Sequence, residues 1–324
     1  MQVQRANKPY AGVVSPATGG RTSFDRHLDA ATIIARYAAM GFDVASYFEG
    51  MTKVAILKCD DTGYRFFHPP SLAGEDAFYE HLDQISMSNS DDPGYRDWSD
   101  DYAYLFERLV PGERLLDVGC GKGAFLKRAA DVCAASGIDG SSKAVAQAMA
   151  SGLDVRLGRT SDFLDEYAGS FDTVCAFQVL EHIYDVADFM RELVAVAKPA
   201  GRIVIAVPNN EPFMRRFDPY LALNCPPHHI GLWDMESLER FGKHLDLKIV
   251  DHAYCETSGR WQVEAYLHAR HLLGIKGEIN THGLGGKLAM LALAPFTVPL
   301  SLLRHLRMGR RGTRNVVVVT FKRC

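Results

Sequence analysis

The chain has 324 residues, of which 47% are hydrophobic and 23% charged, and its formal net charge is −3. These are the values of a globular protein with a sizeable core. The negative balance excludes a globally basic surface, so we expect no nucleic-acid partner. The seven cysteines contain no CxxC pair and no zinc-type Cys/His spacing, and no apolar signal segment follows Met1. We therefore expect a reducing, cytoplasmic location.

Two segments precede the region of regular alternation. Residues 1–26 are polar and rich in Gly, Pro and Ser, which predicts a flexible arm. Residues 27–95 predict a lid or cap module that mixes helix and strand. Within it, helical spacing runs through 28–48, a Gly-containing turn predicts a hairpin over 54–67, and a short helix is expected over 77–85.

Strand and helix patterns alternate from residue 98 onward, which is typical of a parallel sheet. Right-handed crossovers then place helices on both faces, so the predicted fold class is α/β with a doubly wound sheet. The expected elements, in chain order, are helix 98–109, strand 114–118, helix 123–130, strand 134–138, helix 142–151, strand 155–157, strand 171–177, helix 186–197, turn 198–201, strand 202–207, helix 235–245, strand 247–251 and strand 315–321.

A long insertion, residues 257–314, separates the last two strands and is predicted to be helical. Its apolar run over 288–303 contains Pro295 and Pro299 and is shorter than the roughly 20 residues that span a bilayer. Several arginines follow this run. Residues 288–311 could therefore lie on an anionic membrane surface at the inner membrane face. Alternatively, the insertion packs on its own core or forms a homo-oligomer interface.

A glycine-rich loop follows the first predicted strand of the sheet. Asp117 ends that strand, and Gly119, Gly121 and Gly123 open the next helix. Glycines allow a sharp turn and a close approach of a ligand to the backbone. Asp139 ends the next strand, 22 residues after Asp117, where a carboxylate can accept hydrogen bonds from two ribose hydroxyls. The pattern indicates an adenosine-containing ligand.

The loop by itself leaves the identity of that ligand open. Together with Ala124 it also satisfies a dinucleotide fingerprint, so an NAD(P)-dependent oxidoreductase is one alternative. The glycines could also serve only to shape a tight turn. Asp117 favours a ligand with a cationic ammonium group, such as S-adenosylmethionine, because a carboxylate would repel a pyrophosphate.

Five motifs that follow one another along the chain favour S-adenosylmethionine over a dinucleotide. They are Leu115–Gly121, Gly137–Ser141, Phe171–His182, Lys198–Gly201 and Val207–Asn209. With these motifs, roughly residues 98–255 closely resemble the ubiquinone-biosynthesis-like branch of class I S-adenosylmethionine-dependent methyltransferases. The resemblance implies a seven-stranded Rossmann-like sheet whose last strand is antiparallel, with a core at 96–256 completed by 315–324. Ala200 departs from the glycine usual in the family, at a turn position that matters little.

The same resemblance implies S-adenosyl-L-methionine as the cofactor. Asp117 and the loop would hold its methionine end, and Asp139 its ribose. Residues after the third strand would border the adenine, and Gln178 would face the cofactor. The cofactor-binding residues implied in this way are Asp117, Gly119, Cys120, Gly121, Gly123, Asp139, Gly140, Thr160, Ser161 and Gln178.

Three histidines are the candidate catalytic residues on the acceptor side. Methyl transfer is mainly a matter of alignment, and a hydroxyl acceptor also benefits from a general base with a pKa near neutral, such as histidine. His182 follows Glu181, whereas His228 and His229 belong to a Pro-Pro-His-His…Trp segment similar to one in related methyltransferases. Each could instead cap a turn or pack structurally. Glu181-His182 binds a divalent ion in some relatives, but no further ligand has a clear spacing, so we predict no metal.

The N-terminal module also resembles a known segment. The stretch from Cys59 to Pro69, followed by 78–80, is similar to a leader module of bacterial methyltransferases in surface-glycan or secondary-metabolite pathways. The acceptor is accordingly expected to be a small molecule or a glycan- or lipid-linked compound. The module could act as a lid that supplies Tyr64, Arg65 or Phe67, or only cover an edge of the core. A catalytically silent S-adenosylmethionine-binding partner protein is a further alternative.

Overall fold

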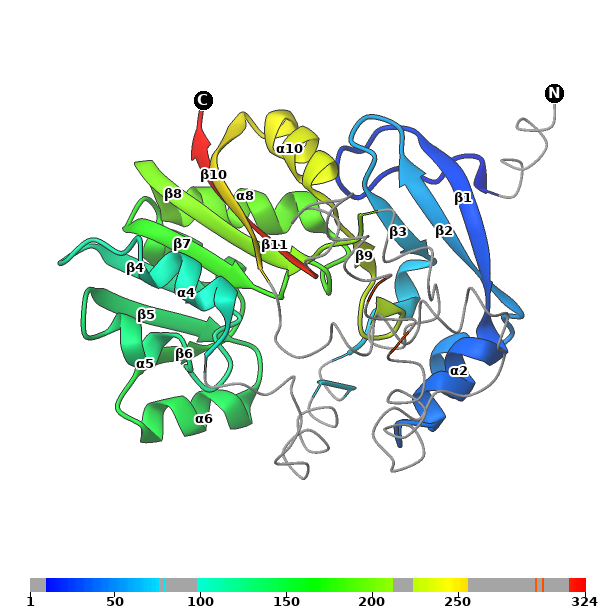
Figure 1. Cartoon of the computed structure of the whole chain (residues 1–324), viewed down its shortest axis with the longest axis horizontal. Helices are drawn as coiled ribbons and strands as arrows, with labels where there is room; N and C mark the ends of the chain where they lie inside the picture. Colours follow the sequence, from blue (N-terminus) through cyan, green and yellow to red (C-terminus); the bar gives the residue numbers. More distant parts are fainter. Residues whose placement is uncertain are drawn as a thin grey trace.

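Two β-sheets of unequal size, with their helices, make up the part of the chain that the structure describes (Figure 1). The structure is a computed structural model. It describes residues 10–75, 78–79, 98–211, 224–255 and 315–324, together with the single positions 295 and 299.

The larger sheet has seven strands in the order β10-β11-β8-β7-β4-β5-β6. Its strands are β4 (Arg114–Val118), β5 (Ala134–Asp139), β6 (Asp154–Leu157), β7 (Phe171–Phe177), β8 (Ala197–Pro208), β10 (Leu247–Cys255) and β11 (Val316–Arg323). The strands β4 to β8 pair in parallel, whereas β11 is antiparallel to both β8 and β10. This arrangement confirms the predicted class: a doubly wound, Rossmann-like methyltransferase sheet with an antiparallel last strand.

Helices cover both faces of this sheet because successive strand residues point to opposite sides. Leu115 packs with α4 (Asp100–Phe106), α5 (Leu126–Ala129) and α6 (Ser142–Ala150). Leu116, its neighbour, belongs to the cluster that α8 (Val186–Val196) and α10 (Met235–His244) cover from the other face. The β7 strand is buried along its length, as expected of a central parallel strand. Two short elements, η4 (Thr160–Phe163) and α7 (Leu164–Tyr167), connect β6 to β7.

The smaller sheet is antiparallel and joins the N-terminal module to the core. Its order is β1-β2-β3-β9, with β1 (Thr22–Asp29), β2 (Lys53–Cys59), β3 (Arg65–His68) and β9 (Gly231–Leu232). The hairpin of β2 and β3 confirms the predicted hairpin. The fourth strand, β9, comes from the segment after the two loop histidines and pairs with β3. The module and the core therefore share one sheet, a contact that the sequence did not reveal.

Three local expectations need correction. Residues 22–26 were assigned to a flexible arm, but they belong to β1, which pairs with β2. The helix expected over 28–48 is α2 (Ala30–Ala38) followed by the turn η2 (Ala45–Phe48), because Gly41 adopts a positive φ of 88° and ends the helical run. The turn expected at 198–201 lies within β8. A further short turn, η3 (Pro70–Leu72), follows β3.

Some expectations concern residues that the structure does not describe. Most of the helix at 77–85 and nearly all of the insertion at 257–314, including the apolar and basic stretch 288–311, lie outside the described residues. Among the helices that are described, none is long and apolar enough to cross a bilayer.

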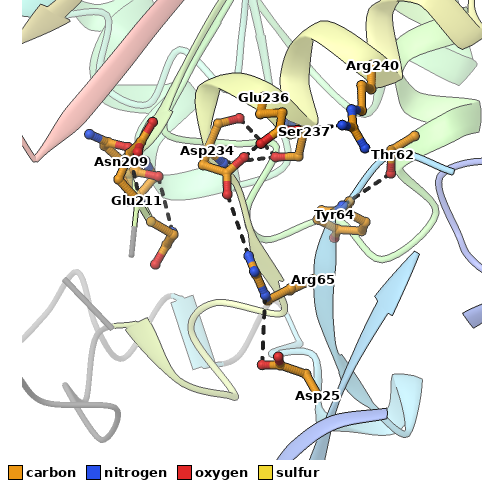
Figure 2. A network of polar contacts seen from close by, with 12 residues as sticks. Asp25, Thr62, Tyr64, Arg65, Asn209, Glu211, Asp234, Glu236, Ser237 and Arg240 are labelled. Atoms are coloured by element: carbon orange, nitrogen blue, oxygen red, sulfur yellow. Dashed lines mark hydrogen bonds and ion pairs between the residues drawn. The ribbon is translucent and has the colours of Figure 1, made fainter. Parts of the chain in front are cut away.

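Polar contacts also connect the smaller sheet to a helix of the core (Figure 2). Arg65 of β3 lies between Asp25 of β1, at 3.8 Å, and Asp234, at 3.5 Å. Asp234 is the N-cap of α10, where its side chain accepts a hydrogen bond from the Ser237 N–H at 2.8 Å. Arg65 therefore links the module to a helix of the core.

Candidate active site

The glycine loop between β4 and α5 is held in a left-handed backbone conformation. Gly119, Gly121 and Gly123 have φ values of 75°, 54° and 77°. A Cβ on Gly119 would lie 2.5 Å from Cγ2 of Val179, and one on Gly123 would collide with a side chain from the loop before β6. A Cβ on Gly121 would meet nothing within 4 Å. Gly119 and Gly123 are therefore required for packing, whereas Gly121 faces open space where a ligand fits against the backbone.

Asp139, at the end of β5, lies beside this loop and is hydrogen-bonded to it. Its two carboxylate oxygens accept hydrogen bonds from the Gly121 N–H, at 2.7 Å, and from the Ser141 N–H, at 2.8 Å. Each oxygen has a second lone pair, so the carboxylate can still accept bonds from ribose hydroxyls. Gly140 next to it also faces open space. Asp139 thus fits the predicted ribose role, and it shapes the loop as well.

Asp117 is buried at the end of β4, with 3% of its surface exposed. Burial raises the pKa of its carboxyl to about 7, assisted by the nearby charge of Asp139 and opposed by a hydrogen bond from the Cys175 thiol. A cationic group beside Asp117 would favour the ionised form. The site therefore fits an ammonium group, such as that of a methionine moiety, better than a phosphate.

Gln178 directly after β7 adopts a positive φ of 56°, which is uncommon for a residue with a side chain. Its N–H donates to the carbonyl of Ala206, and its side-chain amide donates to Asp101 at 3.3 Å. Asp101 lies on α4, is 3% exposed and has a pKa that burial raises. Sequence reasoning missed Asp101, because an acidic residue in the first turn of a helix is ordinary there.

The other predicted cofactor residues differ in exposure. Cys120 is buried against Gly137, and Thr160 is buried with no hydrogen-bond partner for its hydroxyl among the described residues. Ser161 is exposed on η4. An adenine-bordering role for Thr160 and Ser161 stays a prediction.

The three candidate histidines form one cluster. His182 follows β7, and His228 and His229 lie in the loop before β9. Their ring centroids are 4.7 Å apart for His182 and His228, 4.9 Å for His182 and His229, and 4.4 Å for His228 and His229. Residues that are 46 positions apart in the sequence thus meet at one place. We refer to these three residues as the histidine cluster.

Hydrogen bonds fix the rings of this cluster. Nδ1 of His182 lies 2.6 Å from the carbonyl oxygen of His228, so this nitrogen must carry the proton. Burial lowers the pKa of His182 to about 4, and the pKa of His229 lies well below its usual value for the same reason. Both rings are therefore neutral near pH 7. Hydrogen bonds of the His182 ring to the backbone of His228 and Gln178 oppose this lowering of its pKa but are outweighed by burial. In the neutral ring the lone pair is on Nε2.

Two tyrosines of the N-terminal module hold the loop of the cluster in place. The Tyr79 hydroxyl donates to the carbonyl of His228 at 3.1 Å and lies 3.3 Å from Nδ1 of His182. The Tyr37 hydroxyl donates to the carbonyl of Cys225 at 2.8 Å, and the N–H of His228 donates to it at 3.3 Å. The module therefore reaches the candidate acceptor side.

The side chains expected from the lid are placed differently. Tyr64 and Phe67 are almost fully buried, and the ring of Tyr64 stacks on Trp233 with centroids 3.9 Å apart. Arg65 is engaged by its two aspartates (Figure 2). None of these three side chains reaches the histidine cluster among the contacts described. Tyr79 was already part of the leader segment, and that resemblance was the available signal for it.

Glu181 completes the surroundings of the cluster. Its backbone carbonyl accepts hydrogen bonds from the N–H groups of Ile230 and Gly231, both at 2.9 Å. Its side chain is 1% exposed, and neither carboxylate oxygen has a hydrogen-bond partner among the described residues. Burial raises the pKa of this carboxyl to about 8. One carboxylate oxygen lies 4.0 Å from Nε2 of His229.

A comparison with protein families identifies the family to which this chain belongs. Residues 91–252, which are half of the chain, match the model of the methyltransferase domain family. The chain belongs to this methyltransferase family. The predicted recognition as a class I methyltransferase is therefore confirmed in its family and in the order of its sheet.

Curated relatives of this methyltransferase include bacterial enzymes. The ubiquinone biosynthesis O-methyltransferase of Xanthomonas axonopodis pv. citri is 35% identical over 117 residues, which are 34% of this chain and 49% of the relative. The enzyme of the same name from Caulobacter vibrioides is 36% identical over 105 residues, or 30% of this chain and 42% of the relative. The chain thus spans about half the length of these relatives.

Solved structures give more distant matches. An S-adenosylmethionine-dependent methyltransferase from Geobacter sulfurreducens, in complex with S-adenosyl-L-homocysteine, has a TM-score of 0.43 and 20% identity over 69% of this chain and 91% of the other. A second such complex, from Thiobacillus denitrificans, has a TM-score of 0.44 and 17% identity over 78% of this chain and 100% of the other.

Proposed function

We propose that this methyltransferase-family chain uses S-adenosyl-L-methionine to methylate an oxygen of its acceptor. One observation supports this most: the histidine cluster continues directly from the segment that packs on the glycine loop. Val179 fills the space above Gly119, and His182 follows three residues later. Polar groups suited to an acceptor hydroxyl therefore lie next to the loop suited to the cofactor.

In the proposed reaction, the acceptor oxygen attacks the methyl carbon in line with the bond to sulfur. The carbon–oxygen bond forms as the carbon–sulfur bond breaks, and its electron pair stays on sulfur to give S-adenosylhomocysteine. The proton of the hydroxyl passes to a neutral histidine, and Nε2 of His182 carries a lone pair that would accept it. Most of the acceleration would come from alignment of donor and acceptor.

The proposed acceptor is a small molecule or a glycan- or lipid-linked compound. The resemblance of the leader segment to bacterial surface-glycan and secondary-metabolite methyltransferases supports this class. The names of the curated relatives, which are O-methyltransferases, support oxygen as the atom methylated.

Thermal unfolding with added ligands tests the cofactor. S-adenosylhomocysteine should raise the melting temperature of the chain, because a ligand that binds only the folded state stabilises it. Asp139→Asn should weaken the affinity about tenfold, which corresponds to ~1.4 kcal/mol. Asp131→Ala, at an exposed aspartate, is the control. A shift with NADH and none with S-adenosylhomocysteine would refute the proposal in favour of an oxidoreductase.

Turnover with candidate acceptors tests the histidines. His228→Ala and His229→Ala should reduce the release of S-adenosylhomocysteine far more than they reduce its binding. His252→Ala, an exposed histidine on β10, should change neither quantity. Equal losses of binding and turnover would indicate a structural role for the cluster. Absence of turnover with every acceptor class tried, despite tight binding, would favour a catalytically silent partner protein.

A further inference from the structure

The histidine cluster has a property beyond proton acceptance. One ring nitrogen each from His182, His228 and His229 can be chosen so that all three atoms lie within 4.8 Å of one another. Three imidazole nitrogens that converge in this way can share one metal ion, and imidazole is among the commonest protein ligands of divalent transition metals. The sequence drew attention to Glu181-His182 but showed no further ligand, because the loop histidines follow only after more than forty residues.

The second nitrogen of two rings is already engaged. Nδ1 of His182 donates to the carbonyl of His228, and Nδ1 of His229 lies 3.2 Å from the side-chain oxygen of Asn224. Asn224 is itself held by a 2.8 Å hydrogen bond to Asn210. A histidine that ligates a metal usually donates its other ring N–H to such an oxygen, which orients the ring. In this tautomer Nε2 of His182 and Nε2 of His229 each carry a lone pair.

The Glu181 side chain provides an independent observation. It is almost fully buried, and both of its carboxylate oxygens lack a hydrogen-bond partner among the described residues. One oxygen is 4.0 Å from Nε2 of His229, so the carboxyl group lies beside the cluster, outside the set of three converging nitrogens. A buried carboxylate without a partner is costly, and a cation bound close to it reduces that cost.

We propose that His182, His228 and His229 form a binding site for a divalent transition-metal ion of the zinc class, with the Glu181 carboxylate beside the site compensating the charge of the ion. Three imidazole nitrogens suit zinc or cobalt. Magnesium and calcium prefer sites made of oxygen ligands and are excluded by the ligand set.

This inference deepens the proposed function. It rests on that proposal only in taking the acceptor hydroxyl as the group that the metal would bind. At the metal, the hydroxyl oxygen of the acceptor would occupy an open position. The positive charge favours its deprotonated form, as it does for a metal-bound water, and the proton would pass to solvent. The cation would then replace a free histidine as the activating group.

Cobalt titration of the untagged, chelator-treated full chain tests the site. Bound Co²⁺ has visible absorption bands that depend on the ligands and the geometry, so binding is read without any acceptor. We expect a saturable spectrum of low-coordinate Co²⁺ with a single ion per chain, and competition by Zn²⁺ but not by Mg²⁺. Absence of such a spectrum, or competition by Mg²⁺ as strong as by Zn²⁺, overturns the proposal.

Variants test the ligand and the neighbouring charge. His228→Ala, which removes a ligand, and Glu181→Gln, which removes the charge beside the site, should each weaken Co²⁺ binding about tenfold or more. His252→Ala should bind as the wild type does, because His252 is exposed on β10. Glu181→Gln keeps the shape of the side chain, so a melting temperature at or above that of the wild type establishes that it folds. Unchanged Co²⁺ affinity in both the His228 and the Glu181 variant would overturn the assignment.

The same samples separate this inference from the proposed function. A chain that binds S-adenosylhomocysteine but not Co²⁺ would refute the metal site and leave the methyltransferase proposal standing. A chain that binds Co²⁺ but not S-adenosylhomocysteine would refute the methyltransferase proposal and leave the metal site standing.

Discussion

The glycine loop and the histidine cluster follow neighbouring strands, β4 and β7, of one sheet, yet they are assembled in opposite ways. The loop is local: its glycines and Asp117 lie within seven consecutive residues, and Asp139 comes from the next strand. The cluster instead draws on the end of β7, on the loop before β9 and on tyrosines of the N-terminal module. A substitution in the loop should therefore act through backbone conformation, and one near the cluster through tertiary contacts.

The largest expected effect follows from Gly119→Ala. A side chain in the left-handed region costs about 1–3 kcal/mol, and the overlap with Val179 adds to this. We expect at least tenfold weaker binding of S-adenosylhomocysteine, measured by calorimetry. Gly112→Ala has the same backbone strain, at a φ of 81°, but nothing within 4 Å. If the Gly112 variant lost as much affinity, local packing of the loop would not be the cause.

The pH dependence of cofactor binding should distinguish the loop from the rest of the site. Asp117 has a pKa of about 7, and an ammonium group favours its ionised form. The affinity for S-adenosylhomocysteine should therefore increase about tenfold from pH 6 to pH 8. Asp117→Asn should remove this dependence. An equally steep pH profile in the variant would contradict the assignment.

The same carboxyl group predicts the sign of a stability change. Its folded-state pKa lies above the ordinary value of 3.8 for an aspartate, so its contribution to stability is fully present below about pH 4. That contribution is lost as the pH rises toward 7. Without ligand, the wild type should lose stability relative to Asp117→Asn over this interval, as measured by urea unfolding at several pH values.

Tyr37→Phe tests whether the module positions the cluster. The change removes the hydrogen bonds of the hydroxyl to Cys225 and His228, at a cost of about 1–2 kcal/mol. We expect turnover to fall several-fold while cofactor affinity is unchanged. Tyr104→Phe removes a buried hydrogen bond to Thr320 in the core and should reduce stability alone. Similar turnover losses in both variants would indicate general destabilisation.

The smallest effect is expected for the link between the smaller sheet and α10. Arg65→Met removes two ion pairs of a largely buried guanidinium (Figure 2) and should cost about 1 kcal/mol in denaturant unfolding. Arg191→Met, at an exposed pair with Asp188 on α8, should cost less. If Arg65→Met abolished cofactor binding, the glycine loop would depend on the N-terminal module. The contrast between a locally formed glycine loop and a histidine cluster built from tertiary contacts would then fail.

The sequence by itself determined the large sheet and the cofactor loop. Short apolar strand segments that alternate with helices, and the positions of Gly119, Gly121 and Gly123, depend on local sequence and backbone geometry, which short segments specify. The strands β4 and β7 were predicted to the residue for this reason. The last strand was also predicted, because four consecutive valines indicate a buried strand.

Only the tertiary structure decided what surrounds the acceptor side. Glu181 was noted in the sequence only as the neighbour of His182, and it becomes a buried carboxylate because the loop before β9 covers it. The pairing of β9 with β3 brings the module against that loop, and Tyr79 against His182. These contacts join positions far apart in the chain, and no local pattern encodes which distant side chains will meet. The histidines were visible in the sequence, but their convergence was a property of the fold.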